Sequence, residues 1–148
     1  MLVSAKFENI YSFNEETRIL FTASKSDLLP LHVSRAEKRD DFSVLRMGLI
    51  YGANASGKSN VLNAFWFMVN YVLTSHNQQL HKTIERSPFK FDRETPSRPS
   101  SFEVIFTTNG IRYAYGFSVT DKAVIEEYLY YYPNGRQALI FERKDTKD

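Results

Sequence analysis

One stretch decides the fold of this chain: Leu49-Ile50-Tyr51-Gly52-Ala53-Asn54-Ala55-Ser56-Gly57-Lys58-Ser59-Asn60. Gly52 and Gly57 bracket four residues and precede a lysine and a serine, which is the spacing G-x-x-x-x-G-K-[ST] of a P-loop. Glycines let successive backbone N–H groups face a phosphate chain, because no β-carbon intervenes. Lys58 adds a positive charge, and Ser59 offers a hydroxyl to Mg²⁺ in the first turn of a helix whose positive end faces the anion. The stretch therefore predicts a phosphate-binding loop.

The segments on either side of the loop have the order that a P-loop requires. Val44–Tyr51 is a mostly apolar run of strand length, as expected of a buried parallel strand. After the loop, apolar residues recur at helical spacing, which predicts an amphipathic helix from about residue 59 to about residue 73. A glycine turn that merely joins a strand to a helix is the alternative interpretation, and the order strand, loop, helix favours the P-loop.

The composition bounds the kind of protein. The chain has 148 residues, of which 43% are hydrophobic and 15% aromatic, so it is long enough for one packed domain or one lobe of a larger domain. Nineteen basic and seventeen acidic residues give a net charge of +2, which argues neither for nor against a nucleic-acid partner. The absence of cysteine excludes disulfides, thiolate metal sites and cysteine nucleophiles. No stretch approaches the ~20 apolar residues of a membrane span, so we expect a cytoplasmic protein with no membrane partner.

Two β-rich regions flank the P-loop segment. Residues 1–24 alternate between apolar and polar side chains with one break, which predicts an N-terminal β-hairpin whose first strand runs from Leu2 to Phe13. Residues 101–143 alternate over four runs, and Asn109-Gly110 between the first two is a strong hairpin signal. This region predicts an antiparallel β-meander. Its tyrosines, among them Tyr128, Tyr130, Tyr131 and Tyr132, are predicted to pack across strands; base-stacking platforms are the alternative.

The connecting segments carry weaker signals. Residues 25–41, with the charge run 35–41, are expected to form a surface connection with a short helix, and residues 87–100 a loop. His76 and His81 lie five residues apart, which is not the spacing of a helical metal pair, so we expect them to be exposed.

These patterns together predict an α/β fold. We expect a mixed sheet that contains the P-loop strand, a P-loop helix packed on it, and an antiparallel β-subdomain formed by the hairpin and the meander. The chain is then a single partial domain, 1–148, in which 1–24 is the hairpin, 43–75 the P-loop strand, loop and helix, and 101–143 the meander.

Three segments carry a family resemblance. The loop resembles the G-x-N-x-S-G-K-S-N form found in ABC-clade ATPases, which include the SMC and RecF recombination proteins, the OLD nucleases and the related prokaryotic AAA-family ATPases of phage-defence and abortive-infection systems. Phe7-Glu8-Asn9-Ile10-Tyr11-Ser12-Phe13 resembles the F-x-N-[FI]-x-S-F pattern of their N-terminal strand. The region from Pro88 to Arg143 looks most like the defence-associated branch. The resemblance implies the N-terminal lobe of a P-loop NTPase of the ABC-ATPase type.

The resemblance also implies ligands and site residues. ATP and Mg²⁺ are the expected ligands, with Lys58 on the β- and γ-phosphates and Ser59 on Mg²⁺. The backbone from Ala53 to Lys58 would wrap the phosphates, and the Asn54 side chain would lie near the terminal ones. The implied nucleotide-binding set is Gly52, Ala53, Asn54, Ala55, Ser56, Gly57, Lys58, Ser59 and Asn60.

Other motifs of these ATPases do not occur in the sequence. After Ser59 there is no apolar run ending in Asp-Glu and no L-S-x-G signature, and Gln78, Gln79 and Gln137 lack the context of a Q-loop. Since phosphoryl transfer needs several such groups, we expect little ATP hydrolysis and no complete catalytic set in this chain. The hypothesis is an N-terminal lobe whose partners are the missing C-terminal lobe, a second copy in a head-to-head dimer, and a nuclease or another effector protein.

Two other functions remain open. One is a non-catalytic, nucleotide-regulated protein-interaction module whose β-rich half binds a protein, which an exposed aromatic edge on the meander would favour. The other is direct DNA binding, for which the SMC and RecF proteins offer an analogy but the charge balance offers no support.

Overall fold

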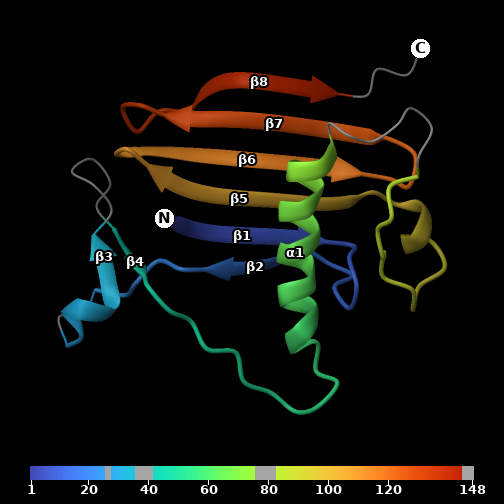
Figure 1. Ribbon diagram of the computed structural model, residues 1–148, viewed down its shortest axis with the longest axis horizontal. Helices are drawn as coiled ribbons and strands as arrows, with labels where there is room; N and C mark the ends of the chain where they lie inside the picture. The colour runs from blue at the N-terminus through green and yellow to red at the C-terminus, as the bar shows by residue number, and fades with distance from the viewer. Residues whose placement is uncertain (26–27, 36–41, 76–82, 145–148) are drawn as a thin grey trace.

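The computed structural model describes residues 1–25, 28–35, 42–75 and 83–144 (Figure 1). Its centre is a six-stranded sheet with the order β2-β1-β5-β6-β7-β8, in which every neighbouring pair is antiparallel. The strands are β1 (Leu2–Glu8), β2 (Thr17–Leu20), β5 (Ser100–Thr108), β6 (Ile111–Val119), β7 (Val124–Tyr132) and β8 (Ala138–Lys144). The N-terminal hairpin and the four-stranded meander predicted from the alternation are therefore confirmed as strands.

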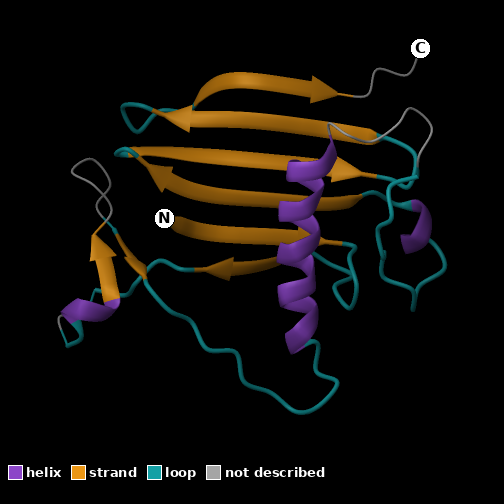
Figure 2. Ribbon diagram, viewed as in Figure 1, coloured by secondary structure: helices purple, strands orange, loops and turns teal. Residues whose placement is uncertain are grey.

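In the described part of the chain, the remaining elements are one long helix, a two-stranded sheet and two 3-10 helices (Figure 2). The helix α1 (Lys58–Thr74) starts directly after the glycine-rich loop, which confirms the predicted helix. A separate two-stranded sheet pairs β3 (Val33–Arg35) with β4 (Ser43–Leu45). Two 3-10 helices, η1 (Pro30–His32) and η3 (Thr95–Ser97), lie in the connecting segments, so the short helix expected within residues 25–41 is present as η1. No helix among the described residues is both long and apolar enough to span a membrane.

Aromatic stacking fixes α1 on one face of the sheet. The helix crosses β1, β5 and β6 in turn, and each crossing is a ring contact within the hydrophobic core. The contacts pair Phe65 with Phe7 (5.5 Å), Phe67 with Phe102 (5.2 Å) and Tyr71 with Phe117 (5.1 Å). Such ring pairs stabilise by about 0.5–1.5 kcal/mol each beyond the area that they bury. Because Phe65 already lies over β1, the first turn of α1 projects beyond the β2 edge of the sheet (Figure 1).

The prediction of a mixed sheet with a buried parallel P-loop strand is wrong. The predicted strand Val44–Tyr51 is reduced to β4, which pairs with β3 outside the main sheet. Within the described part of the chain no strand pairs with residues 46–57, and the side chains of Met47 and Tyr51 are 64% and 84% exposed. A strand forms only beside another strand, and this segment leads to a helix end that lies beyond the sheet edge. The apolar run is therefore extended but unpaired.

Other boundaries also differ from the prediction. The first strand ends at Glu8 rather than Phe13, because Asn9 and Tyr11 have φ values of 51° and turn the chain. The cross-strand packing predicted for the tyrosines is confirmed where Tyr131 stacks on Tyr113, with ring centroids 6.4 Å apart. The predictions for His76, His81, Gln78 and Gln79, and for residues 36–41 and 145–148, lie outside the described residues.

Gly116 on β6 is the glycine with the least room. A β-carbon at this position would overlap Cζ and Oη of Tyr128 on the neighbouring strand and approach its Cε1 to 2.9 Å. Gly116→Ala is expected to destabilise the fold by about 1–3 kcal/mol, the usual cost of overpacking. Urea denaturation followed by circular dichroism measures this. Gly48→Ala is the matched control, since its β-carbon would meet only Phe21 at 4.0 Å; equal midpoints for the two variants would contradict the prediction.

We predict that the fold loses stability at alkaline pH because of two tyrosine hydroxyls on the sheet. Burial, together with a hydrogen bond to Glu127 Oε1 at 2.7 Å, raises the pKa of Tyr115 above its usual 10.0; burial and Glu103 raise the pKa of Tyr128 in the same direction. The folded state thus favours the neutral hydroxyls, so their stabilisation is complete below about pH 10 and is lost as pH rises through the folded pKa values. The urea midpoint is expected to fall above about pH 10. Tyr115→Phe with Tyr128→Phe is expected to flatten this fall, and an unchanged slope would contradict the assignment.

Candidate functional site

The glycine-rich loop closes onto the start of α1 through two local turns. The N–H of Ser56 donates to the carbonyl of Ala53 at 3.3 Å, and the N–H of Asn60 donates to the carbonyl of Gly57 at 2.9 Å. Gly57 is the N-cap residue with φ of 88°, a left-handed conformation that glycine adopts at no steric cost. Ala55 also has a positive φ, 62°. The chain thus reverses direction within a few residues of the loop and then leads directly into the N-terminus of α1.

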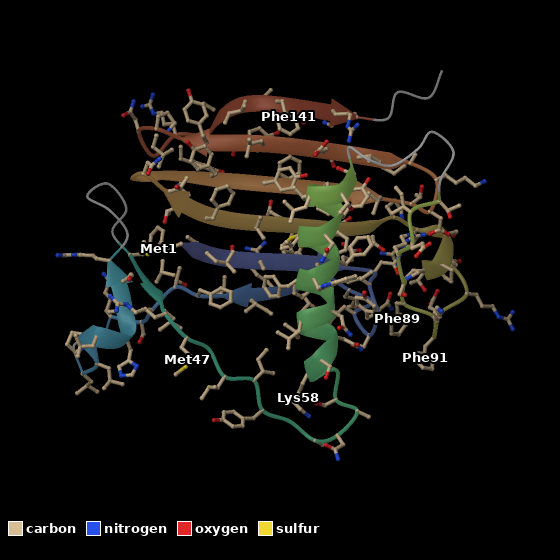
Figure 3. The ribbon with its side chains drawn as sticks, viewed as in Figure 1. Met1, Met47, Lys58, Phe89, Phe91 and Phe141 are labelled. Carbon is tan, nitrogen blue, oxygen red and sulfur yellow. The ribbon has the colours of Figure 1, made fainter. Side chains whose placement is uncertain are left out.

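Lys58 points back into this loop. Its Nζ donates to the carbonyl of Gly52 at 2.8 Å and to the carbonyl of Ala53 at 2.5 Å. Figure 3 shows the Lys58 side chain at the first turn of α1. The loop therefore holds an ammonium group next to the uncapped end of a helix. This is the charge that a chain of phosphate oxygens requires.

Gly52 lies against the opposite side of the loop. A β-carbon there would lie 2.7 Å from Oγ of Ser56, so a larger residue would require the Ser56 side chain to move. The spacing of the two glycines has a direct steric reason in this structure.

The N-terminus of α1 favours an anion. Its first turn contains no acidic residue, and no side chain caps it by a hydrogen bond. The first N–H groups of a helix lack intrahelical acceptors and carry a partial positive charge. Ser59 is exposed in this turn, so its hydroxyl is accessible to a metal ion on a bound phosphate. Among the described residues no three His, Asp or Glu side chains gather as a metal site.

The structure therefore brings all nine predicted residues, 52–60, into one continuous loop and helical turn. Asn54 is exposed at the tip of the loop. The individual roles predicted for these residues on phosphates and Mg²⁺ stay predictions.

Sequence reasoning missed the residue that anchors the chain beside this loop, Asn9. Its Nδ2 donates to the carbonyls of Thr95 at 2.7 Å, Arg98 at 2.9 Å and Pro99 at 3.2 Å, and its Oδ1 accepts from the N–H of Phe89 at 3.1 Å. The residue is completely buried. The only signal was the F-x-N-[FI]-x-S-F resemblance, which does not say that the asparagine binds a segment more than 80 residues away.

Arg86 completes this anchor from the other side. Its side chain is 1% exposed, and its Nε donates to Oδ1 of Asp121 at 2.6 Å. Its Nη1 donates to Oγ of Ser100 at 3.0 Å, and that hydroxyl donates to the carbonyl of Asn9. A buried guanidinium with these partners fixes the loop before β5 against the end of β1.

The class of protein follows from this geometry. A glycine-bounded loop leads into a helix N-terminus with a lysine turned into the loop, which is consistent with the G-x-x-x-x-G-K-S sequence, while the strand that precedes a P-loop is not formed among the described residues. Residues 49–148, which are 100 of the 148, match the family described as "AAA domain, putative AbiEii toxin, Type IV TA system". The chain belongs to this AAA-domain family, whose members are nucleotide-binding and ATPase-like. No curated protein is similar enough in sequence to match the chain.

Proposed function

We propose that this chain is the Mg-ATP-binding N-terminal lobe of an ABC-type ATPase. The observation that carries the proposal is the position of Lys58, whose ammonium group is held inside the glycine loop by the carbonyls of Gly52 and Ala53. Phosphate oxygens are stronger partners for an ammonium group than neutral carbonyls, so the ligand would take over these hydrogen bonds. The backbone from Ala53 to Lys58 would wrap the phosphates, and Ser59 would bind Mg²⁺.

Calorimetric titration of Mg-ATP into the purified chain tests this proposal. Saturable binding with one nucleotide per chain is the expected result, and the affinity should fall when Mg²⁺ is replaced by EDTA, because Ser59 then loses the ion that it shares with the phosphates. AMP should bind more weakly than ATP, since the loop faces the β- and γ-phosphates. Equal binding of AMP and ATP, or none of either, would refute the phosphate assignment.

The proposal includes little hydrolysis by the chain itself. Transfer of the γ-phosphate to water needs a positioned water and several charges around the transition state, and the loop supplies only Lys58 and the helix N-terminus. Phosphate release at the rate of an ordinary ATPase, ~1–100 per second, would contradict an incomplete lobe. The family description supports a place for the intact protein in toxin–antitoxin or abortive-infection defence, where closure around ATP would drive a nuclease or another effector.

The proposal also includes a protein partner, a C-terminal ATPase lobe that covers the outer face of α1. The helix is apolar on two sides, because one side packs on the sheet and the other presents a stripe at positions i, i+4, i+7 and i+11. The exposed stripe consists of Leu62, Trp66, Val69 and Leu73. Because a helix buries its apolar faces against other elements, two apolar faces favour a second layer over the exposed one. The unpaired run 47–51, apolar and extended, would supply one strand of that second layer.

Co-expression with the C-terminal ATPase lobe of the same system tests this second lobe. Trp66 is the only tryptophan and is 65% exposed, so its fluorescence maximum should shift to shorter wavelength when the lobe covers it. Trp66→Lys is expected to prevent co-elution of the two polypeptides, whereas Lys122→Ala on the far turn should not. Co-elution of the Trp66→Lys variant would refute this surface.

The sheet edge supports a second candidate function, a nucleotide-regulated protein-interaction module. β8 is an edge strand, and Leu139, Ile140 and Phe141 on it are all exposed. Figure 3 labels Phe141 on this strand. Such an edge accepts an added strand from a partner. Sedimentation with and without Mg-ATP separates the two candidates. Dimers that form only with Mg-ATP support the head-to-head ATPase. An oligomeric state that is the same with and without Mg-ATP supports the interaction module.

A further inference from the structure

The segment after β1 forms a rigid corner, which we call the Asn9–Phe13 corner. Ile10 and Phe13 exchange two backbone hydrogen bonds, at 3.0 and 2.9 Å, and the N–H of Tyr11 donates to the carbonyl of Ser87 at 2.7 Å. Ile10 is completely buried, and the Phe13 ring packs on Phe7 at 5.5 Å. The corner is therefore fixed by its own turn, by the core and by the neighbouring loop.

This corner meets the glycine loop through Ser12. A β-carbon on Gly57 would lie 2.9 Å from Oγ of Ser12 and 3.8 Å from its Cβ. The serine is exposed, and within the described part of the chain no hydrogen bond of its hydroxyl is found. The Ser12 side chain thus occupies the space in which a residue other than glycine at position 57 would place its β-carbon.

The position of Gly57 determines what the loop can bind. Its left-handed φ of 88° sets the direction in which the chain enters α1. Lys58 follows directly, so a change at Gly57 would reorient both the lysine and the first N–H groups of the helix. The rest of α1 cannot follow such a change, because Phe65 is held against Phe7 on β1. The helix therefore packs on β1, and the loop lies beside the corner that follows β1.

We propose that Ser12 is a positioning residue, which supports Gly57 in its left-handed conformation and so orients the phosphate-facing end of α1. The inference rests on the proposed nucleotide binding for its functional consequence, but the support itself is a property of the chain without ligand. It gives the serine of the F-x-N-[FI]-x-S-F segment a physical role. It also gives Gly57 a second reason to be glycine, since a β-carbon would displace Ser12.

Hydrogen exchange of the nucleotide-free chain tests the support directly. Ser12→Leu inserts a larger side chain beside Gly57, and we expect the amides of residues 57–60 to exchange at least about fivefold faster, as local order is lost. Ser24→Leu, at an exposed serine in the connection after β2, is the control and should leave these amides unchanged. Equal exchange in the two variants would overturn the inference. Ser12→Thr, which adds one methyl group, offers the same test at smaller amplitude.

Mg-ATP titration then separates support from direct contact. Ser12→Leu should weaken Mg-ATP binding by roughly tenfold, which corresponds to the lower part of the range of destabilisation that overpacking causes. Ser12→Ala removes Oγ, the atom nearest to Gly57, and should weaken binding by about twofold to threefold, less than leucine does; binding equal to that of the parent chain would mean that Oγ gives Gly57 no support. If alanine weakens binding as much as leucine, the hydroxyl itself contacts the ligand and the positioning role is wrong. If the parent chain binds no Mg-ATP, the proposed function fails, while the exchange experiment still decides the role of Ser12.

Discussion

Replacing Lys58 by alanine is expected to weaken Mg-ATP binding by roughly tenfold to a hundredfold, the range of a lost hydrogen bond to a charged group. The ammonium group is the only side-chain charge that the structure holds inside the glycine loop, among the residues described. The fold should be unaffected, because Nζ contacts only the carbonyls of Gly52 and Ala53. Calorimetry measures the affinity, and circular dichroism measures the fold.

Two matched variants control the Lys58 experiment. Lys122→Ala removes a lysine from the exposed turn between β6 and β7 and should leave the affinity unchanged. Lys58→Arg keeps the charge but brings a larger planar group, so its affinity should fall between those of the parent chain and the alanine variant. An alanine variant that binds as tightly as the parent chain would mean that Lys58 does not contact phosphate.

Replacing Asn9 by aspartate is expected to lower the free energy of unfolding by about 3 kcal/mol or more, because a carboxylate oxygen would then face three carbonyl oxygens in a buried site. The amide of Asn9 donates to the carbonyls of Thr95, Arg98 and Pro99, and none of these could donate in return. Asn9→Ala removes the same bonds without adding a charge and should cost less, about 2 kcal/mol.

Thermal and urea denaturation measure both Asn9 variants. Asn63→Asp, at an exposed position of α1 with one weak amide contact at 3.4 Å, is the control and should change stability by less than about 0.5 kcal/mol. If Asn9→Asp were as stable as Asn63→Asp, the anchor between β1 and the loop before β5 would not contribute to stability. Loss of the Asn9 hydrogen bonds should also reduce the local order at Ser12, which follows Asn9 in the same corner.

Prediction from sequence succeeded where structure depends on near neighbours in the chain. The glycine spacing implies the loop that turns into α1, and the alternation around Asn109-Gly110 implies the β5–β6 hairpin, because both arise from local backbone geometry. It failed for residues 46–51. Their apolar, β-prone composition is that of a buried strand, but pairing needs a neighbouring edge, and composition carries no information about where that edge lies.

The candidate site likewise has one part that local sequence predicts and one part that it does not. The sequence alone determined its phosphate-facing part, residues 52–60, and with it the family, because a loop that binds phosphate through its backbone needs glycine and lysine at set intervals. Only the tertiary structure decided what surrounds that loop: Ser12 beside Gly57, Asn9 and Arg86 anchoring the corner, and α1 laid across an antiparallel sheet with its outer face exposed. These contacts join residues far apart in the chain, so they depend on how the hydrophobic core packs rather than on any local pattern.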